Sequence, residues 1–341
     1  MTSIKPIKLA LDINGGDFGP DLTVAAACDA IKLRSDLEII LVGLDTRLES
    51  ELEGLSESQC ARIKMVHAAV VLESGVGPVA AIRHGNKSSM GRAIELVSVG
   101  EADACVSAGS TTALMALSIK MIGMLDGLKR PALMARIPSA KGFTNLLDLG
   151  ANLNVDAIGL VQFAIMGVVA KGASSELEPS VGLLNVGHED SKGHSVVKAA
   201  HERLKELPLN YQGFIEGNDI FSGKVDVAVC DGFSGNLVLK SSEELARMLF
   251  REVKEGFKRS WRTRLGALLA GPGLRAALAR FEPAQHNGAP LLGLKGVVVK
   301  SHGSANRAGV LQAILEASDK AGRKVPGRIQ TLIAQYEAET K

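Results

Sequence analysis

Short apolar runs alternate with longer segments of helical spacing along most of this 341-residue chain. The apolar runs are rich in β-branched residues, which is typical of strands, whereas the segments between them have the spacing of helices. We predict strands at 8–13, 38–42, 63–71, 104–108, 131–137 (a candidate edge strand), 145–149, 181–186, 213–216, 225–230 and 297–300. We predict helices at 20–34, 78–84, 90–99, 113–122, 156–170 and 196–207.

This alternation indicates a mostly parallel sheet that is covered by helices on both faces. No repeat, low-complexity segment or Ser/Pro-rich linker divides the chain into halves. We therefore predict one three-layer α/β/α domain of Rossmann-like architecture over residues 4–338.

Residues 242–283 depart from the alternation and predict a protruding amphipathic helical hairpin. Leucine, valine, phenylalanine and tryptophan recur every four residues from 245 to 261, which places them on one helix face. Residues 247–280 hold nine basic and two acidic side chains. The run Gly271-Pro272-Gly273 predicts a break before a second basic helix at 274–281.

Such a hairpin is typical of a surface that binds a membrane or an acidic partner. We expect Arg251, Lys254, Lys258 and Trp261 to form this surface. The alternative is a hairpin that packs at a dimer interface and keeps its basic face in solvent.

Composition excludes several classes of protein. With 46% hydrophobic residues the chain can bury a large core, and its net charge of +2 argues against binding nucleic acid. The four cysteines lack metal or redox spacing, which fits a reducing cytoplasm. We find no signal peptide and no apolar run of membrane-spanning length. Dinucleotide, P-loop, nucleophile-elbow and zinc-protease motifs are absent from the sequence, so we expect neither a metal nor a cofactor.

Small polar residues follow strand after strand, and the clearest case is the turn at 300–304, read as Lys-Ser-His-Gly-Ser. A strand end that leads into a helix start faces the ligand crevice of such sheets and attracts anions. Similar turns occur at 14–17, 86–89, 107–112, 152, 185–192 and 231–236. The alternative at each is an ordinary helix cap. Together these turns indicate an α/β transferase that handles phosphate.

Eight short motifs resemble, in order, those of the PlsX family of acyl-acyl carrier protein:phosphate acyltransferases. They lie at 11–20, 86–90, 106–115, 147–152, 162–167, 182–187, 229–236 and 288–296. Two positions depart from the family pattern: Ser110-Thr111-Thr112 replaces the usual Asn-Thr-Gly, and His286-Asn287 replaces Tyr-Gly. We expect these departures to lie near the acyl entrance.

The resemblance implies transfer of a long-chain acyl group from acyl carrier protein to inorganic phosphate, for phospholipid synthesis, on a fold related to phosphotransacylases. It also implies a homodimer in the cytoplasm, peripherally associated with the inner face of the cell membrane. There it would supply a membrane glycerol-3-phosphate acyltransferase. No cofactor is implied.

Under this hypothesis we assign roles to particular residues. Phosphate would be bound by Gly15, Gly16, Asp17, Lys87, Ser88, Ser107, Gly109, Ser301, Gly303 and Ser304. Lys192 and Lys300 would neutralise charge, and Asn152, Asn185 or Asn236 would donate to an oxyanion. Asp231 would orient a lysine or His302, and His302 is the candidate acceptor of a phosphate proton.

Three other functions remain as alternatives. A phosphotransacylase that uses a coenzyme A thioester has a similar fold and chemistry. A non-catalytic regulator could dock on membranes through 245–281, although such a protein would not need the polar strand ends. A decarboxylating dehydrogenase would need NAD and a carboxylate cluster for a metal, and the sequence shows no such cluster.

Overall fold

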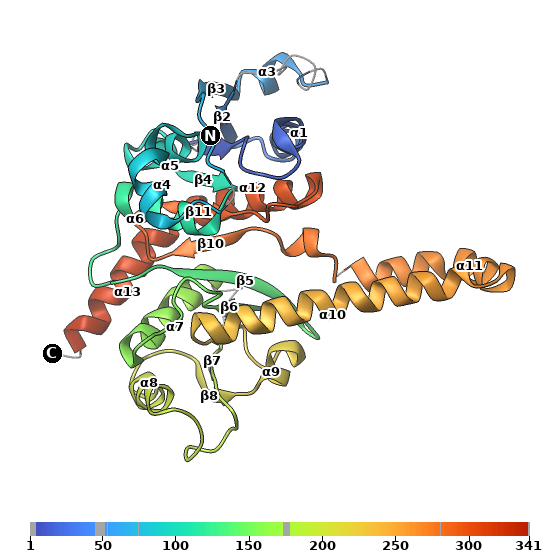
Figure 1. The fold of residues 1–341 in the computed structure, drawn as a ribbon. Coiled ribbons are helices and arrows are strands. Elements are labelled where there is room, and N and C mark those ends of the chain that lie inside the picture. The colour runs from blue at the N-terminus through green and yellow to red at the C-terminus, as the bar shows by residue number, and fades with distance from the viewer. Residues whose placement is uncertain are drawn as a thin grey trace.

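Eleven strands form one sheet in the computed structural model, which describes residues 5–44, 52, 54–73, 75–172, 178–279 and 281–339. The strands are β1 (Ile7–Asp12), β2 (Leu37–Gly43), β3 (Ile63–His67), β4 (Ala104–Ser107), β5 (Ala132–Ser139), β6 (Gly142–Leu147), β7 (Val181–Leu184), β8 (Tyr211–Ile215), β9 (Val227–Val229), β10 (Ala289–Leu292) and β11 (Val297–Lys300). Their order across the sheet is β3-β2-β1-β4-β11-β10-β5-β6-β9-β7-β8 (Figure 1).

The sheet consists of two parallel groups that run in opposite directions. Strands β3, β2, β1, β4 and β11 are parallel to one another, and so are β6, β9, β7 and β8. Between the groups, β10 pairs antiparallel with both β11 and β5, and β5 pairs antiparallel with β6. Three successive reversals make the second group antiparallel to the first.

Three strand predictions were wrong in detail. The segment predicted as an edge strand is β5, which lies in the middle of the sheet. Strand β10 was not predicted, because a four-residue run that contains Pro290 is too short to show a period. Strand β3 ends at His67, short of the expected residue 71, and Val70 instead forms a bridge with Ser88.

Helices cover both faces of each group. The helical elements are α1 (Gly19–Leu33), α3 (Glu57–Cys60), α4 (Pro78–His84), η1 (Gly85–Lys87), α5 (Ser89–Ser98), α6 (Thr111–Met121), α7 (Ala157–Lys171), α8 (Ser195–Lys205), α9 (Gly217–Ser222), α10 (Gly232–Lys258), α11 (Trp261–Ala279), η2 (Pro283–His286), α12 (Arg307–Gly322) and α13 (Val325–Glu339).

Alternating residues of each strand pack against opposite helix layers. In the first group α1 and α12 cover one face, while α4, α5 and α6 cover the other. In the second group α7, α8 and α13 cover one face, and α9 and the start of α10 lie on the other. The predicted mostly parallel, three-layer α/β fold is therefore confirmed. The single domain boundary at 4–338 stays a prediction, and residue 4 lies outside the described residues.

The predicted hairpin is formed by α10 and α11, which extend away from the body (Figure 1). Helix α10 has 27 residues and begins at Gly232, ten residues before the expected start of this segment at 242. The break lies at Ser260, whose side chain and backbone exchange hydrogen bonds with Thr263. The predicted break at 271–273 was wrong, because α11 continues through Pro272. Proline has no backbone N–H, so the carbonyl of Leu268 lacks its helical hydrogen-bond donor. Leu268 is exposed, so water can donate to this carbonyl instead.

A buried ionic cluster links α12 to β5. Glu316 is 3% exposed and forms ion pairs with Arg136 of β5 and with Lys320, whose Nζ lies 2.7 Å from its carboxylate. Asp319 also pairs with Lys320, at 3.1 Å. Burial lowers the pKa of Lys320 to about 8, against the opposing effect of Asp319.

Candidate active site

Three neighbouring parallel strands end together and place their last residues in one row. Asp12 of β1 is in register with Ser107 of β4, and Ser107 is in register with Lys300 of β11. Asp12 and Ser107 are buried, at 2% and 0% exposure. The ends of these three strands and the turns that follow contain ten of the predicted site residues: Gly15, Gly16, Asp17, Ser107, Gly109, Lys300, Ser301, His302, Gly303 and Ser304. We call this group the strand-end cluster.

Lys300 supplies the cation of the strand-end cluster. Its Nζ donates to the carbonyl of Ala108 at 3.2 Å and to that of Ser301. Burial lowers the pKa of Lys300 to about 8, and the charges of Asp17 and Asp12 oppose this shift. An ammonium group that has lost part of its hydration binds an anion more strongly than a fully solvated one.

Backbone hydrogen bonds join the three turns to one another. The N–H of Asp17 donates to the carbonyl of Gly303 at 2.9 Å, and the N–H of Ser301 donates to that of Ser107 at 2.9 Å. Helix α1 has no side-chain cap, so Asp17 does not serve as one. Its carboxylate lies against Gly303 instead, since a Cβ on Gly303 would come within 3.2 Å of it.

Gly15 is glycine because two of these turns approach each other closely. A Cβ at Gly15 would lie 2.6 Å from a carboxylate oxygen of Asp12 and 2.7 Å from the backbone nitrogen of Gly109. At Gly16 the nearest atoms would be 3.4 Å away, which is ordinary van der Waals contact.

We therefore expect Gly15→Ala to lower the free energy of unfolding by about 1–3 kcal/mol, because backbone atoms must move. It should also lower acyltransferase activity, because the Gly109 turn moves with them. The matched variant Gly16→Ala should change stability by no more than about 0.5 kcal/mol. Urea unfolding of both variants measures the difference, and equal effects would contradict this account of Gly15.

His302 is held as a neutral imidazole by its own turn. Its Nδ1 lies 3.2 Å from the backbone nitrogen of Ser304, which donates to it, and 2.9 Å from the Ser304 hydroxyl. Burial lowers the pKa of His302, and the nearby charge of Lys300 lowers it further. Since Nδ1 accepts, the proton of the neutral ring is on Nε2. This geometry suits a hydrogen-bond donor rather than the proton acceptor that we predicted.

Asn287 fixes the Ser301–His302 turn and was not predicted as a site residue. Its Nδ2 donates to the hydroxyl of Ser301 at 2.8 Å and to the carbonyl of Gly309 at 2.7 Å. Its Oδ1 accepts from the N–H of His302 at 2.9 Å. Asn287 is one of the positions that depart from the family pattern, and here it contacts the strand-end cluster directly.

Helix α10 carries further charges to the cluster, and these were also missed. The charge of Lys240 lowers the pKa of Lys300, and Glu243, Lys240 and Arg247 all act on that of His302. Asn236, Lys240, Glu243 and Arg247 are spaced by four, three and four residues, so they form one stripe along the helix. The spacing was visible in the sequence, but only the fold shows which surface this stripe faces.

Two predicted site residues cap helices instead: Ser88, predicted to bind phosphate, and Asp231, predicted to orient a lysine or His302. The buried Ser88 hydroxyl accepts from the N–H of Gly91 at 3.1 Å and donates to the carbonyl of Gly85, so it caps α5. The Asp231 carboxylate accepts from the N–H of Ser234 at 2.8 Å and caps α10. The capping alternative therefore describes both, and neither residue has the contact that its predicted role requires. Lys87 is exposed in η1, beside Ser88.

Three more predicted residues belong to the second strand group. The buried amide of Asn152 donates to the carbonyl of Pro131 at 2.7 Å and to Asp148 at 3.0 Å. Asn185 donates to carbonyls of the turn after β7, and Lys192 pairs with Glu189 at 2.9 Å. Strands β9, β6, β5 and β10 separate β7 from β11. The structure therefore does not bring Asn185 and Lys192 into the strand-end cluster.

Asn236 is exposed on the first turns of α10, with its side chain next to Gly150. Further along the hairpin, Arg251, Lys254, Lys258 and Trp261 are all exposed. The side chain of Trp261 is 71% exposed, and the guanidinium of Arg262 lies 5.5 Å from its ring centre. These positions match the predicted outer surface, although they do not identify what it binds.

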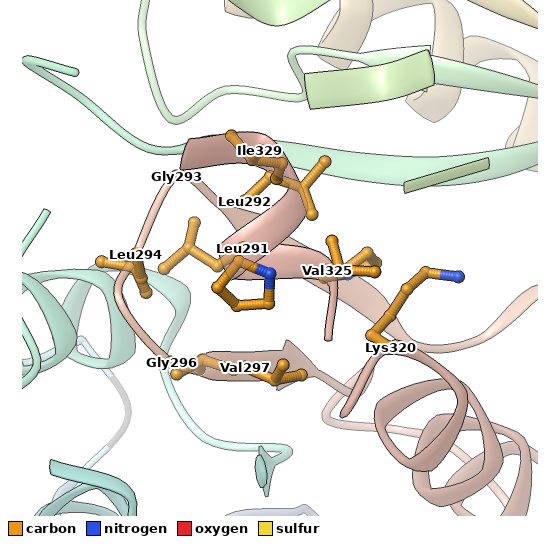
Figure 2. A pocket seen from close by; sticks show the side chains of 12 residues that line it. Leu291, Leu292, Gly293, Leu294, Gly296, Val297, Lys320, Val325 and Ile329 are labelled. Carbon is orange, nitrogen blue, oxygen red and sulfur yellow. The ribbon is translucent and has the colours of Figure 1, made fainter. Parts of the chain in front are cut away.

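A small cavity lies away from this cluster (Figure 2). It is lined by leucines of β10, by the start of β11 and by Val325 and Ile329 of α13, with Lys320 at one side. Its volume of about 10 Å³ holds roughly one water molecule. It therefore has no room for an acyl chain.

Comparison with known proteins identifies the family. A family model described as fatty acid synthesis protein matches residues 7–328. A phosphate acyltransferase from Methylococcus capsulatus is 46% identical over 94% of this chain and 95% of its own length. One from Shewanella sediminis is 45% identical over 95% of this chain and 96% of its own. This chain belongs to the phosphate acyltransferase (PlsX) family. It is an acyltransferase.

Solved structures support the fold of this phosphate acyltransferase family member. A phosphotransacetylase from Staphylococcus aureus superposes with a TM-score of 0.60 at 15% identity, covering 93% of this chain and 94% of its own. A branched-chain phosphotransacylase from Enterococcus faecalis gives 0.56 at 16% identity, covering 92% and 99%. The predicted relation to the phosphotransacylase fold is therefore confirmed. Among the described residues, no helix is both long and apolar enough to cross a bilayer.

Proposed function

We propose that this enzyme transfers a long-chain acyl group from the thioester of acyl carrier protein to inorganic phosphate. The observation that carries the proposal is the strand-end cluster, in which three joined turns surround the ammonium of Lys300. Relatives named phosphate acyltransferase, 43–46% identical to this chain, support phosphate as the acyl acceptor.

The chemistry needs positioning and charge rather than a protein nucleophile. A phosphate oxygen attacks the thioester carbonyl carbon and forms the new C–O bond, and the carbonyl becomes an oxyanion. The C–S bond then breaks, and its electron pair leaves on sulfur. A thiol with a pKa near ~8.5 gives a stable thiolate, so strong acid catalysis is unnecessary.

Residues of the cluster fit these steps. Lys300 would bind the phosphate dianion, with Lys240 adding positive charge from α10. The Nε2–H of His302 would donate to a phosphate oxygen, because its Nδ1 is occupied by Ser304. Of the three asparagines proposed for the oxyanion, Asn236 fits best, because it lies on the same α10 stripe as Lys240. The amide of Asn152 instead donates to Pro131 and Asp148, and that of Asn185 donates within its own turn.

The exposed basic face of the hairpin would bind acyl carrier protein, an acidic partner, or the anionic membrane surface where the product is used. We further propose a homodimer and peripheral attachment to the inner face of the cell membrane, where acyl phosphate would supply a glycerol-3-phosphate acyltransferase. Exposed apolar residues of α10 and α11, among them Leu245, Leu249 and Leu268, support contact with a second chain or with lipid.

Charge reversal of Arg251, Lys254 and Lys258 should weaken binding to acyl carrier protein or to anionic vesicles by about tenfold or more. The reason is that each basic residue near an anionic surface contributes on the order of 1 kcal/mol. Co-sedimentation with vesicles and surface plasmon resonance with the carrier protein measure the two possibilities.

The matched control reverses Lys198, Arg203 and Lys205, three cations of α8 in the second half of the chain. It changes net charge by the same amount and should leave both interactions near wild type. Equal losses in the two triple variants would mean that overall charge, and not this face of the hairpin, determines binding.

Thiol release from palmitoyl-acyl carrier protein, with and without phosphate, tests the proposed reaction. The same assay with palmitoyl-coenzyme A tests the donor. Release that requires phosphate and the carrier protein supports the proposal, and equal release from coenzyme A would favour a general phosphotransacylase. Release that does not depend on phosphate would contradict the proposed reaction.

A further inference from the structure

Asp12 is a buried carboxylate at the centre of the strand-end cluster that none of the proposed catalytic steps uses. It is 2% exposed and terminates β1. Its Oδ2 accepts from the hydroxyl of Ser107 at 2.6 Å, and its Oδ1 accepts from the N–H of Asn14 at 3.2 Å. The buried hydroxyl of Ser89, the first residue of α5, also lowers the pKa of this carboxyl.

These contacts indicate that Asp12 is ionised in the folded protein. Ser107 and Asn14 both donate to it, and the 2.6 Å distance to Ser107 lies in the range of a hydroxyl bonded to a carboxylate anion. Burial raises the pKa of Asp12 above its ordinary value, and Ser107, Ser89, Asn14 and the charge of Lys300 offset part of this rise by favouring the charged form. A buried anion needs a compensating cation.

Lys300 is that cation. Both residues lie in the same row, one strand to either side of Ser107. Their charges interact, although the ammonium makes its hydrogen bonds to the carbonyls of Ala108 and Ser301 rather than to the carboxylate. The ammonium therefore keeps donor capacity for an incoming anion, which a direct ion pair with Asp12 would reduce.

The same contacts determine the orientation of Ser107. Its hydroxyl accepts from the N–H of Gly109 at 3.1 Å and donates its only proton to Asp12. It therefore has no proton left for phosphate, unlike the role that we predicted for it. Its function is to hold the Gly109 turn against Asp12.

We propose that Asp12 is a positioning residue that keeps Lys300 charged and fixes the Ser107–Gly109 turn without touching the substrate. This inference deepens the proposed function and rests on it for the identity of the anion. The other charged groups that act on Lys300 are Asp17 after β1, Lys240 of α10 and His302 of its own turn.

Titration of Lys300 itself tests the inference without any acyl transfer. Lysines are methylated with ¹³C-formaldehyde, and the resonance of Lys300 is assigned by its loss in Lys300→Arg. Asp12→Asn removes the charge and should lower the pKa of Lys300 by about one unit from the wild-type value of about 8. Ser107→Ala leaves the charge and should change it by no more than a few tenths.

Asp12→Glu keeps the charge and provides a test even if Asp12→Asn does not fold. In Asp12→Glu, Lys300 should titrate near its wild-type pKa. In Asp12→Asn, the KM for phosphate should begin to rise at a pH about one unit lower than in wild type. An unchanged Lys300 pKa in folded Asp12→Asn, or a lowered one in Asp12→Glu, would overturn the inference. Because the resonance reports on Lys300 without turnover, failure of the proposed reaction would remain a separate result.

Discussion

Replacing Lys300 with methionine is expected to lower kcat/KM for phosphate by about 100-fold or more, while the melting temperature stays near that of wild type. A positioned group that stabilises charge in a buried site is commonly worth about 10²–10³ in rate. The ammonium of Lys300 lies among the ends of β1, β4 and β11. Methionine fills a similar volume without the charge.

Stability should not fall with activity, because the folded protein desolvates this ammonium, as its lowered pKa shows. Removing the ammonium relieves this desolvation, since the described contacts of Lys300 Nζ are to carbonyl oxygens, but it also leaves the buried carboxylate of Asp12 without its compensating cation. These two effects oppose each other, so we expect methionine at this position to change the stability only slightly.

Lys192→Met is the matched control, because we predicted from the sequence that Lys192 and Lys300 both neutralise charge. Lys192 is exposed and pairs with Glu189 in the turn after β7. We expect this variant to keep nearly full activity. Steady-state kinetics with varied phosphate distinguishes the two lysines, and an active Lys300→Met or an inactive Lys192→Met would contradict the placement of the site.

Activity should also decline above a pH of about 8, where Lys300 loses its proton. Only the ammonium form attracts phosphate, so kcat/KM for phosphate should approach a tenfold fall per pH unit on the alkaline side. Lys300→Arg retains a cation that does not titrate in this range, so whatever activity it has should lack this decline. Rates measured between pH 7 and 9.5, corrected for spontaneous thioester hydrolysis, provide the comparison.

Titration of Lys300 affects stability in the opposite direction from activity. Its folded pKa of about 8 lies below the ordinary value of 10.5, so between these pH values the unfolded chain binds more protons. Its contribution to the free energy of unfolding therefore increases as the pH rises through this window, and the buried Lys320 acts in the same direction. Titration of these two lysines therefore does not unfold the protein as the pH rises. A rate that stays constant to pH 9.5 would contradict the role of the Lys300 ammonium.

Much of the fold could be predicted because the spacing of apolar residues along the chain distinguishes strands from helices. The helix predicted at 78–84 is α4, and the strand at 104–108 differs from β4 by one residue. What the pattern did not contain is strand direction. The apolar runs of β5 and β10 do not show that these strands reverse the sheet. The β5–β6 and β10–β11 pairs are hairpins between strands adjacent in the chain, and the β10–β5 pairing that joins them links segments far apart in sequence.

The site could be predicted only in part, for a related reason. Polar turns after strands were found correctly, but a turn residue that caps its own helix has the same local sequence as one that binds a ligand. Ser88 and Asp231 are caps, whereas the Ser301–Ser304 turn joins the cluster. Asp12 was missed because it is the last residue of an apolar run. Its neighbours Ser107 and Lys300 lie on other strands, and only the strand register shows that they are close.

The most direct test of the account follows phosphate oxygen into the product. The purified full chain is incubated with palmitoyl-acyl carrier protein and ¹⁸O-labelled phosphate, and the products are identified by mass spectrometry. We expect wild type to form palmitoyl phosphate that retains all of the phosphate label, and Lys300→Met to lose this product. Palmitate without palmitoyl phosphate, or equal product from Lys300→Met, would contradict phosphate attack at the strand-end cluster.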